Sequence, residues 1–405
     1  MRSEAARGGS PAPQQPIPGH NRIDPDSPAA GRPQPGGQPP GPGSGDRPPL
    51  EAILLVGGQG TRLRPLTVDR PKQLVPCAGA PFLAHQLARA AASGITRVIL
   101  ATCFRAELFA EAFGDGSVLG LELDYVQEDV PLGTGGGIRN AAAGLRSGPE
   151  DPVVVLNGDL LSGHDLSAQL DMHSKADAAV TLHLEEVDDP SRFGCVPTDD
   201  SGRVTAFLEK TPHPVTNRVN AGCYVFRRRI IDQIPAGAVV SVERETFPAL
   251  IAAGELIMGY AETAYWLDVG TPEAFVQGSR DLVLGELSSA ALPGRTGDLL
   301  ALPGARIDPA ATVTGGTVVG AGCTVAGGAE IDGSVLMDGA AVAAGARVRA
   351  SIVGIGARIG PGVILDSAVI GDGAEIMAGN ELRCGARVWP GVRLSPTAVR
   401  FSTDA

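Results

Sequence analysis

The C-terminal part of the chain carries a repeat that few folds can accommodate. Aliphatic side chains recur every six residues from Ile307 to Leu394, and only three of the fifteen intervals are shortened to five. The shortened steps lie 17 residues apart, as expected for a coil with two six-residue sides and one five-residue side. Gly, Ala and Asp fill the positions between, which suits tight corners. The pattern predicts a parallel β-helix of hexapeptide repeats over residues 302–395. The aliphatic positions are Ile307, Val313, Val319, Val325, Ile331, Leu336, Val342, Val348, Val353, Ile359, Leu365, Ile370, Ile376, Leu382, Val388 and Leu394.

Residues 50–287 follow another pattern, in which short apolar runs alternate with segments of helical character. Continuous apolar strands that alternate with helices indicate an α/β domain, Rossmann-like, with a mostly parallel central sheet. We expect strands at 53–56, 98–102, 123–127, 153–157 and 178–182, and helices at 81–93 and 108–113.

The remaining segments are expected to be tails or linkers. Residues 1–49 are rich in proline and glycine and contain few aliphatic side chains. Such a segment buries too little apolar surface to offset its ordering entropy, so we predict that it is disordered. Residues 288–301 are expected to link the two domains, and residues 396–405 to form a C-terminal tail.

Composition narrows the choice of partners. The net charge of −12 argues against nucleic acid, although a nucleotide needs only a locally basic pocket. The six cysteines have no C-x-x-C spacing and are typical of free thiols in a reducing compartment. The chain has neither an apolar run of about 18 residues nor a secretory signal. We therefore expect a cytoplasmic protein that binds neither nucleic acid nor a membrane.

A glycine-rich turn follows the first apolar run. It reads Gly57-Gly58-Gln59-Gly60-Thr61-Arg62-Leu63-Arg64-Pro65. Glycines let the backbone approach a polyphosphate and leave its N–H groups free to bind anionic oxygens, while Arg62 and Arg64 add positive charge. The spacing matches neither a P-loop nor G-x-G-x-x-G. It predicts a phosphate-binding loop of another kind.

This turn is followed by Pro71-Lys72-Gln73-Leu74. The pair G-G-x-G-T-R-L-x-P and P-K-x-L resembles the signature of the sugar-1-phosphate nucleotidyltransferases, or NDP-sugar pyrophosphorylases. Among them, the mannose-1-phosphate guanylyltransferases with a C-terminal left-handed β-helix are the most similar. The resemblance implies transfer of a nucleotidyl group from an NTP to a sugar-1-phosphate, with release of pyrophosphate and with Mg²⁺ as cofactor. It also implies a homo-oligomer formed through the β-helix and the catalytic domain.

The same resemblance implies roles for particular residues. Asn157-Gly158-Asp159 and Trp266-Leu267-Asp268 match the motifs that supply the metal ligands, here Asp159 and Asp268. Phe207-Leu208-Glu209-Lys210 resembles F-x-E-K-P, and Asn220-Ala221-Gly222 resembles the start of a sugar-contacting strand. The implied catalytic residues are Arg62, Lys72, Lys210, Asp159 and Asp268. The implied nucleotide-binding residues are Leu55, Gly57, Gly58, Gly60, Thr61, Arg62, Lys72, Glu128, Gly133 and Thr134, and the implied sugar-binding residues are Gly158, Glu209, Lys210, Asn220 and Gly222.

The segment Ser241-Val242-Glu243-Arg244 also matches the family. Here a capped helix start, with Ser241 as the cap, is about as well supported as a direct contact with substrate.

Glu128 bears on the choice of base. It lies five residues before Gly133, where relatives that use uridine or thymidine nucleotides commonly have Gln. An amide suits the single donor and flanking acceptors of uracil and thymine, whereas a carboxylate suits the two adjacent donors of guanine. GTP is therefore favoured, and with it mannose-1-phosphate. A one-residue bulge would instead present the amide of Gln127.

Three alternatives stay open at this point. One is a uridylyl- or thymidylyltransferase that acts on glucose-1-phosphate, and another is a non-catalytic regulatory protein that binds nucleotide sugars. The third, a hexapeptide acyltransferase, normally needs a histidine base in its β-helix, and residues 302–395 contain no histidine.

Overall fold

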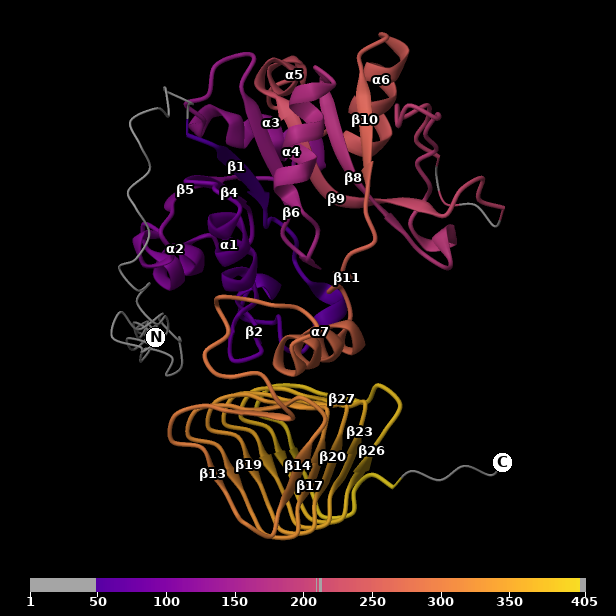
Figure 1. The fold of residues 1–405 in the computed structure, drawn as a ribbon. Helices are drawn as coiled ribbons and strands as arrows, with labels where there is room; N and C mark the ends of the chain where they lie inside the picture. Colours follow the sequence, from indigo (N-terminus) through magenta and orange to yellow (C-terminus); the bar gives the residue numbers. More distant parts are fainter. Residues whose placement is uncertain (1–48, 209, 211–212, 401–405) are drawn as a thin grey trace, which may run out of the picture.

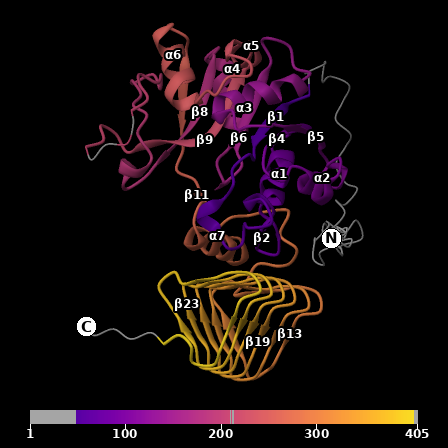
Figure 2. The ribbon, with the colours of Figure 1, turned by 180° about the vertical axis from the view of Figure 1, so that it is seen from behind.

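The computed structural model describes residues 49–400 except 209, 211 and 212. The predicted disorder of residues 1–48 and the last five residues of the predicted C-terminal tail lie outside this range. Within this range, an α/β domain packs against a β-helix, with α7 (Pro272–Leu284) and strand β2 (Pro76–Cys77) between them (Figure 1). The view from behind shows the same arrangement (Figure 2). Among the described residues, no helix has the length and hydrophobicity needed to cross a membrane.

The α/β domain is built on a seven-stranded sheet with the order β10-β8-β9-β6-β1-β4-β5. All neighbours are parallel except β9, which runs antiparallel to both β6 and β8. The predicted mostly parallel sheet is confirmed, and each of the five predicted strands overlaps an observed one. The strands are β1 (Glu51–Leu55), β4 (Arg97–Thr102), β5 (Glu122–Gln127), β6 (Pro152–Asn157), β8 (Val180–Glu186), β9 (Arg218–Arg227) and β10 (Ile257–Ala261).

Helices cover both faces of this sheet. Ala52 and Leu54 of β1 pack in one core with α1, α2 and α4, whereas Ile53 packs in the other core with α3, α5 and α6. Because β1 is buried on both faces, its sequence is a continuous apolar run rather than an alternating one. The helices are α1 (Phe82–Ala92), α2 (Glu107–Phe113), α3 (Gly133–Ala141), α4 (Leu166–Lys175), α5 (Arg228–Gln233) and α6 (Phe247–Ala252).

The C-terminal domain is the predicted β-helix, with three faces of stacked parallel strands consistent with a left-handed coil. The first face holds β12 (Leu299–Ala301), β15 (Thr317–Val319), β18 (Val335–Leu336), β21 (Ile352–Val353), β24 (Val369–Ile370) and β27 (Arg387–Val388). The second holds β13 (Arg306–Ile307), β16 (Thr324–Val325), β19 (Ala341–Val342), β22 (Arg358–Ile359), β25 (Glu375–Ile376) and β28 (Arg393–Leu394). The third holds β14 (Thr312–Thr314), β17 (Glu330–Asp332), β20 (Arg347–Arg349), β23 (Ile364–Asp366) and β26 (Glu381–Leu382).

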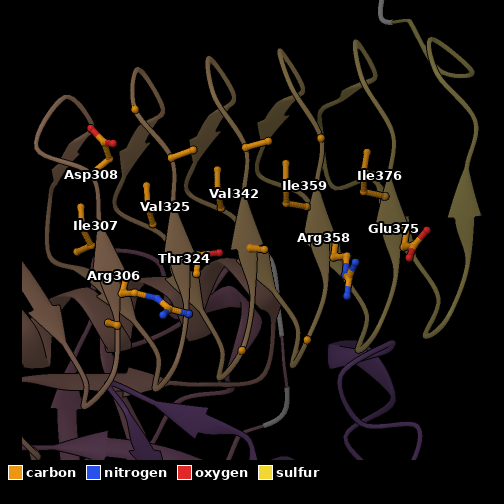
Figure 3. Close-up of a pocket in the computed structure, with 18 of the residues that line it drawn as sticks. Arg306, Ile307, Asp308, Thr324, Val325, Val342, Arg358, Ile359, Glu375 and Ile376 are labelled. Atoms are coloured by element: carbon orange, nitrogen blue, oxygen red, sulfur yellow. The ribbon is translucent and has the colours of Figure 1, made fainter.

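The aliphatic residues of the repeat stack in rows from coil to coil. Figure 3 shows one row, in which Ile307, Val325, Val342, Ile359 and Ile376 come from successive coils. Together with the rows of the other faces they form a single buried core. The six-residue period therefore reflects one inward side chain for each face of the coil.

Both ends of the β-helix extend beyond the repeat. Leu299–Ala301 pairs with β15, although residues 288–301 are predicted as a linker. Residues 396–400 are predicted to be tail, yet Val399 bonds through its backbone to Glu381 and to the side chain of Asn380. Neither segment carries a large aliphatic residue in the register of the repeat, so the sequence pattern does not include them.

The first face of the β-helix is apolar on its outer side too. Val318, Val335, Ile352 and Val369 point away from the core of the coil and pack in a cluster with α7 and the loop before α1. This cluster joins the two domains. It explains why β15, β18, β21 and β24 of this face each have two adjacent aliphatic residues.

A ladder of buried hydroxyl groups runs up one corner of the β-helix. The Ser334 N–H donates to Thr317 Oγ1 at 3.2 Å, and the Ser351 N–H donates to Ser334 Oγ at 3.1 Å. The Ala368 N–H then donates to Ser351 Oγ at 3.0 Å. Each hydroxyl supplies the acceptor that the next coil lacks at this corner.

Replacing Ser351 with Ala should therefore destabilise the β-helix. The change leaves the buried Ala368 N–H without its acceptor, which costs about 1–3 kcal/mol in free energy of unfolding. Urea unfolding followed by circular dichroism measures this difference against Ser395→Ala, which removes an exposed hydroxyl in the same domain. Equal stability of the two variants would contradict the role given to the ladder.

Candidate functional site

The glycine-rich loop lies at the carboxyl end of β1, beside the carboxyl end of the parallel strand β6. Ligands of α/β sheets bind at the carboxyl ends of strands, at the point where the chain switches from one side of the first strand to the other. Here β4 lies on one side of β1, and β6 lies on the other. The Gly158 N–H after β6 donates to the Leu55 carbonyl at 2.9 Å, and a Cβ on Gly158 would lie 2.4 Å from that oxygen. Glycine at 158 is therefore needed for the two segments to meet.

The loop turns back on itself at Gly60, which has a left-handed φ of 61°. A Cβ at this position would lie 2.9 Å from Lys72 Cβ, and Thr67 Oγ1 donates to the Gly60 carbonyl at 2.7 Å. The turn leads into a single 3-10 turn at Thr61–Leu63 (η1) and then a second at Lys72–Leu74 (η2). This folding brings Arg62 and Lys72 to one side of the sheet edge.

The two predicted metal ligands come from neighbouring short strands. β7 (Leu160–Ser162) pairs antiparallel with β11 (Trp266–Asp268), so that Asp268 lies opposite Leu160. The backbone N–H of Val269 also donates to the Asp159 carbonyl at 2.9 Å. Two carboxylates that are 109 residues apart in sequence thus lie at adjacent positions.

Asp268 is the electrostatic centre of the site. Its Oδ1 atom is buried and has no hydrogen-bond partner among the described residues. Burial and the adjacent Asp159 carboxylate raise the pKa of Asp268. Three cations act in the opposite direction, those of Lys72, Arg62 and Lys210. The structure therefore brings the five predicted catalytic residues together around one carboxylate.

Direct contacts support this grouping. Lys72 Nζ lies 2.7 Å from Asp159 Oδ2, and both side chains are mostly buried. A Cβ on Gly270 would lie 2.4 Å from the Arg62 guanidinium and 3.1 Å from Asp268 Oδ1. The absence of a side chain at Gly270 thus gives Arg62 its place beside Asp268.

A divalent cation fits this carboxylate pair. An unpartnered buried oxygen of Asp268 faces a second carboxylate, and such a pair is stabilised when a cation binds between them. Among the described residues no group of three or more His, Cys, Asp or Glu side chains could hold a metal. A cation at this site would therefore take its other ligands from substrate phosphates and water, as Mg²⁺ commonly does.

A pocket of about 450 Å³ is connected with this cluster through Lys210, which belongs to both. Lys210 and Asn220 line it, together with Thr134, Phe193 and Glu243. Two of the predicted sugar-binding residues therefore face one cavity. A third, Glu209, lies outside the described residues.

Gly222 contacts Asn220, one of the residues that line this pocket. It has a left-handed φ of 71°, and a Cβ there would lie 2.7 Å from Asn157 Nδ2. The N–H of Gly222 donates to Asn220 Oδ1 at 3.1 Å, which fixes the orientation of that side chain.

Glu243 is the residue that the sequence analysis did not assign to the site. Its Oε2 accepts hydrogen bonds from Thr134 Oγ1 at 2.8 Å and Ser241 Oγ at 3.0 Å. Its Oε1 accepts from the hydroxyl of Tyr224 at 3.4 Å, and that hydroxyl accepts from Asn220 Nδ2. The match of residues 241–244 to the family was the available signal. Ser241 also caps the turn, since its Oγ accepts from the Arg244 N–H.

Glu128 lies at the other end of the site, just after β5. Burial raises the pKa of its carboxyl group, and its Oε2 accepts the Leu132 N–H at 3.0 Å. A Cβ on Gly137 would lie 2.7 Å from Glu128 Oε1 and 3.6 Å from the side chain of Leu55. Glu128 and Leu55 thus both lie against Gly137 of α3, which has no side chain. The other carboxylate oxygen of Glu128 already accepts the Leu132 N–H.

Gly133 and Thr134, the other two residues predicted here, have backbone and hydrogen-bonding roles. Gly133 has a φ of 73°, and its backbone passes so close to Val240 that a Cβ would lie 2.6 Å from the Val240 carbonyl oxygen. Thr134 Oγ1, besides its bond to Glu243, accepts the Val242 N–H at 2.9 Å. Both residues therefore fix the start of α3 against the segment that carries Glu243.

A larger hollow lies elsewhere on the molecule. It has a volume of about 1310 Å³ and runs along the second face of the β-helix, beside Arg306, Thr324 and Arg358 (Figure 3). None of the predicted site residues lines it. The smaller pocket, in contrast, is lined by the predicted site residues Lys210 and Asn220 and is large enough for a sugar.

Comparison with known proteins agrees with this geometry. The model of the nucleotidyl transferase family matches residues 51–283, and that of the GMPPB C-terminal domain matches residues 295–397. A mannose-1-phosphate guanylyltransferase of Mycobacterium tuberculosis is 54% identical over 356 residues, which cover 88% of this chain and 98% of the relative.

Two further similarities cover less of the chain. A mannose-1-phosphate guanylyltransferase catalytic subunit beta of Drosophila pseudoobscura pseudoobscura is 36% identical over 65% of this chain and 70% of its own length. The crystal structure of HddC from Yersinia pseudotuberculosis complexed with GMP-PN is 27% identical, with a TM-score of 0.50. It covers 57% of this chain and 99% of that protein.

The family model spans more than half of the chain, and the five catalytic residues that the family motifs imply meet at one site. The chain therefore belongs to the nucleotidyl transferase family and is a sugar-1-phosphate nucleotidyltransferase.

Proposed function

We propose that this protein transfers GMP from GTP to mannose-1-phosphate and so forms GDP-mannose and pyrophosphate. The observation that carries the proposal is the cluster of three cations with Asp159 and Asp268, in which Lys210 also lines a sugar-sized pocket. The choice of GTP and mannose-1-phosphate is supported by the names of the relatives and by the carboxylate of Glu128 at the base end of the site.

In this proposal, an oxygen of the sugar phosphate attacks the α-phosphorus of the nucleotide, and the bond to the β-phosphate breaks. Negative charge is spread over phosphoryl oxygens in the transition state, so the protein contributes mainly position and positive charge. Arg62 and Lys72 would bind the triphosphate, and Lys210 would bind the sugar phosphate. Asn220 and Glu243 would orient the sugar hydroxyls in the pocket.

Asp159 and Asp268 would hold Mg²⁺, which supplies further positive charge to the phosphate oxygens. Lys72 pairs with Asp159 in the described structure, so its ammonium is held in place before substrate binds. Among the described residues Asp268 Oδ1 has no hydrogen-bond partner, which supports it as a ligand of the cation.

The recognition of guanine by Glu128 needs both carboxylate oxygens to accept hydrogen bonds. One oxygen already accepts the Leu132 N–H, but a carboxylate oxygen has a second lone pair for a base donor. The hydrogen bond from the Leu132 N–H also restrains the carboxylate, because Leu132 directly precedes α3. Glu128 would thus be preorganised for the two adjacent donors of guanine.

We further propose that the chain forms a homo-oligomer and acts in the cytoplasm. The six cysteines are free thiols, which supports a reducing compartment. Static light scattering of the full chain tests the oligomer, and a monomer at micromolar concentration would contradict it.

Pyrophosphate release tests the substrate pair directly. Purified protein with Mg²⁺ should turn over GTP with mannose-1-phosphate in preference to UTP, dTTP, ATP or CTP, and in preference to glucose-1-phosphate. Selective turnover of another pair would keep the enzyme class but reject the assignment of guanine and mannose. Binding of GTP without any turnover would favour a regulatory protein.

The variant Asp268→Asn should lose Mg²⁺-dependent activity without losing stability. We expect a decrease in kcat of at least about 100-fold, because a buried charge ligand of the cation is removed. The metal-free melting temperature should not fall, since the change removes a partly buried charge that is repelled by the adjacent Asp159 carboxylate. Pyrophosphate release and thermal melting measure both effects, with the exposed Asp200→Asn as control. Near-normal activity of Asp268→Asn would remove it from the metal site.

The variant Glu128→Gln should lower the preference for GTP. Gln keeps an oxygen for the Leu132 N–H but offers guanine one acceptor and one mismatched donor. We expect kcat/KM for GTP to fall about 10- to 100-fold relative to UTP, as for a mispaired polar group worth about 1–3 kcal/mol. The matched control is Glu122→Gln at the start of β5, the strand that ends just before Glu128, where Glu122 forms an ion pair with the exposed Arg146. An unchanged preference would show that another residue recognises the base.

A further inference from the structure

The last coil of the β-helix interrupts the apolar ladder that joins the two domains. On the outer side of the first face the ladder runs through Val318, Val335, Ile352 and Val369. The register of β24 with β27 places Arg387 next in this row. The row thus ends in a guanidinium at the edge of the catalytic domain.

Arg387 contacts the backbone of the phosphate-binding loop. Its Nη1 donates to the backbone carbonyls of Arg62 and Arg64, both at 2.8 Å. These are the carbonyls of the catalytic arginine and of the residue two positions later. Arg387 and Arg62 are 325 residues apart in sequence, and Arg387 binds the backbone of the loop.

The loop needs a donor from outside at this point. In a 3-10 turn the carbonyl of residue i accepts from the N–H of residue i+3, as Gly60 does from Leu63 and Thr61 from Arg64. The corresponding donor for Arg62 would be residue 65, which is proline and has no N–H. Arg387 supplies the hydrogen bond to the Arg62 carbonyl that Pro65 cannot donate.

A second link joins the same two elements. The Arg70 guanidinium pairs with the Asp372 carboxylate, and both side chains are mostly buried. Asp372 lies in the turn between β24 and β25, where its Oδ1 also accepts the Ile355 N–H at 2.9 Å. Arg70 is two residues before the catalytic Lys72, so the two links bracket the segment from Arg62 to Lys72.

We propose that Arg387 is a positioning residue of the catalytic domain: from the sixth coil of the β-helix it fixes the backbone of the phosphate-binding loop and thereby the place of Arg62, with Asp372 as a second support. The kinetic part of this inference rests on the proposed nucleotidyl transfer.

The geometry explains why the two links matter for the reaction. The Arg62 guanidinium lies beside Asp268 and the backbone of Gly270, where a Cβ would displace it. The contacts of Arg387 fix the backbone from which this side chain extends. A loop freed from Arg387 would still bind nucleotide through its glycines, but its arginine would be less well placed for the transition state.

The variant Arg387→Ala of the full chain tests this role. We expect kcat for pyrophosphate release to fall about tenfold, because small misplacements of a catalytic group reduce rates steeply. KM for the sugar phosphate should change less than about threefold, and the melting temperature should stay within about 2 °C, since the Arg387 side chain is exposed. Hydrogen exchange of the amides in residues 57–70 should become faster.

Three further variants separate positioning from general damage to the β-helix. Arg387→Lys keeps an N–H donor for the two carbonyls and should recover most of the lost rate. Asp372→Asn keeps an acceptor for the Ile355 N–H but removes the charge that pairs with Arg70, and should lower kcat in the same direction. Arg347→Ala removes an exposed arginine that pairs with Glu330 on the third face, and should leave kcat and exchange unchanged.

The outcomes decide the matter in either direction. An Arg387→Ala variant with kcat within twofold of the wild type and unchanged exchange in residues 57–70 would overturn the inference. An equal loss in Arg347→Ala would do so too, because it would point to the β-helix as a whole. If the wild type turned over no substrate pair, the proposed function would fail, while the exchange measurements would still test the positioning of the loop.

Discussion

Burial of the first β-helix face on both of its sides is the constraint on which the rest of the structure depends. Its inner row completes the core of the coil, and its outer row packs against α7 and the segment between the glycine-rich loop and α1. Leu63 of the glycine-rich loop and Leu66, just after it, are buried in the same cluster. The glycine-rich loop is therefore anchored by a hydrophobic cluster shared with the other domain as well as by its own sheet.

The chemistry of the site depends on charges that oppose and balance one another. Two carboxylates lie close enough to disfavour joint ionisation, and three cations face them. In the proposed function, substrate phosphates and a cation would offset this repulsion. In the pocket lined by Lys210, the carboxylate oxygens of Glu243 accept hydrogen bonds from the hydroxyl groups of Thr134, Tyr224 and Ser241.

Much of this could be predicted from the sequence, and the exceptions have physical reasons. The period of six specifies the β-helix because each face must bury one aliphatic residue in every coil. The short motifs around Asp159 and Asp268 locate the site because they belong to the family signature. Glu243 and Arg387 were not assigned roles, since their partners are far away in sequence and are fixed only by tertiary packing. β12 lies outside the repeat because Ala301 occupies the position that pairs with Val319.

The regular spacing of the coils fixes how far along the axis of the β-helix each residue lies. Neighbouring strands of a sheet are about 4.8 Å apart, so each coil shifts the next by that amount along the axis. Arg387 meets the loop because five strands of its face precede it. One additional coil before it would carry its guanidinium about 4.8 Å beyond the carbonyls that it binds. The number of coils before Arg387 is thus matched to the position of the loop, and a change in that number requires another residue to make the contact.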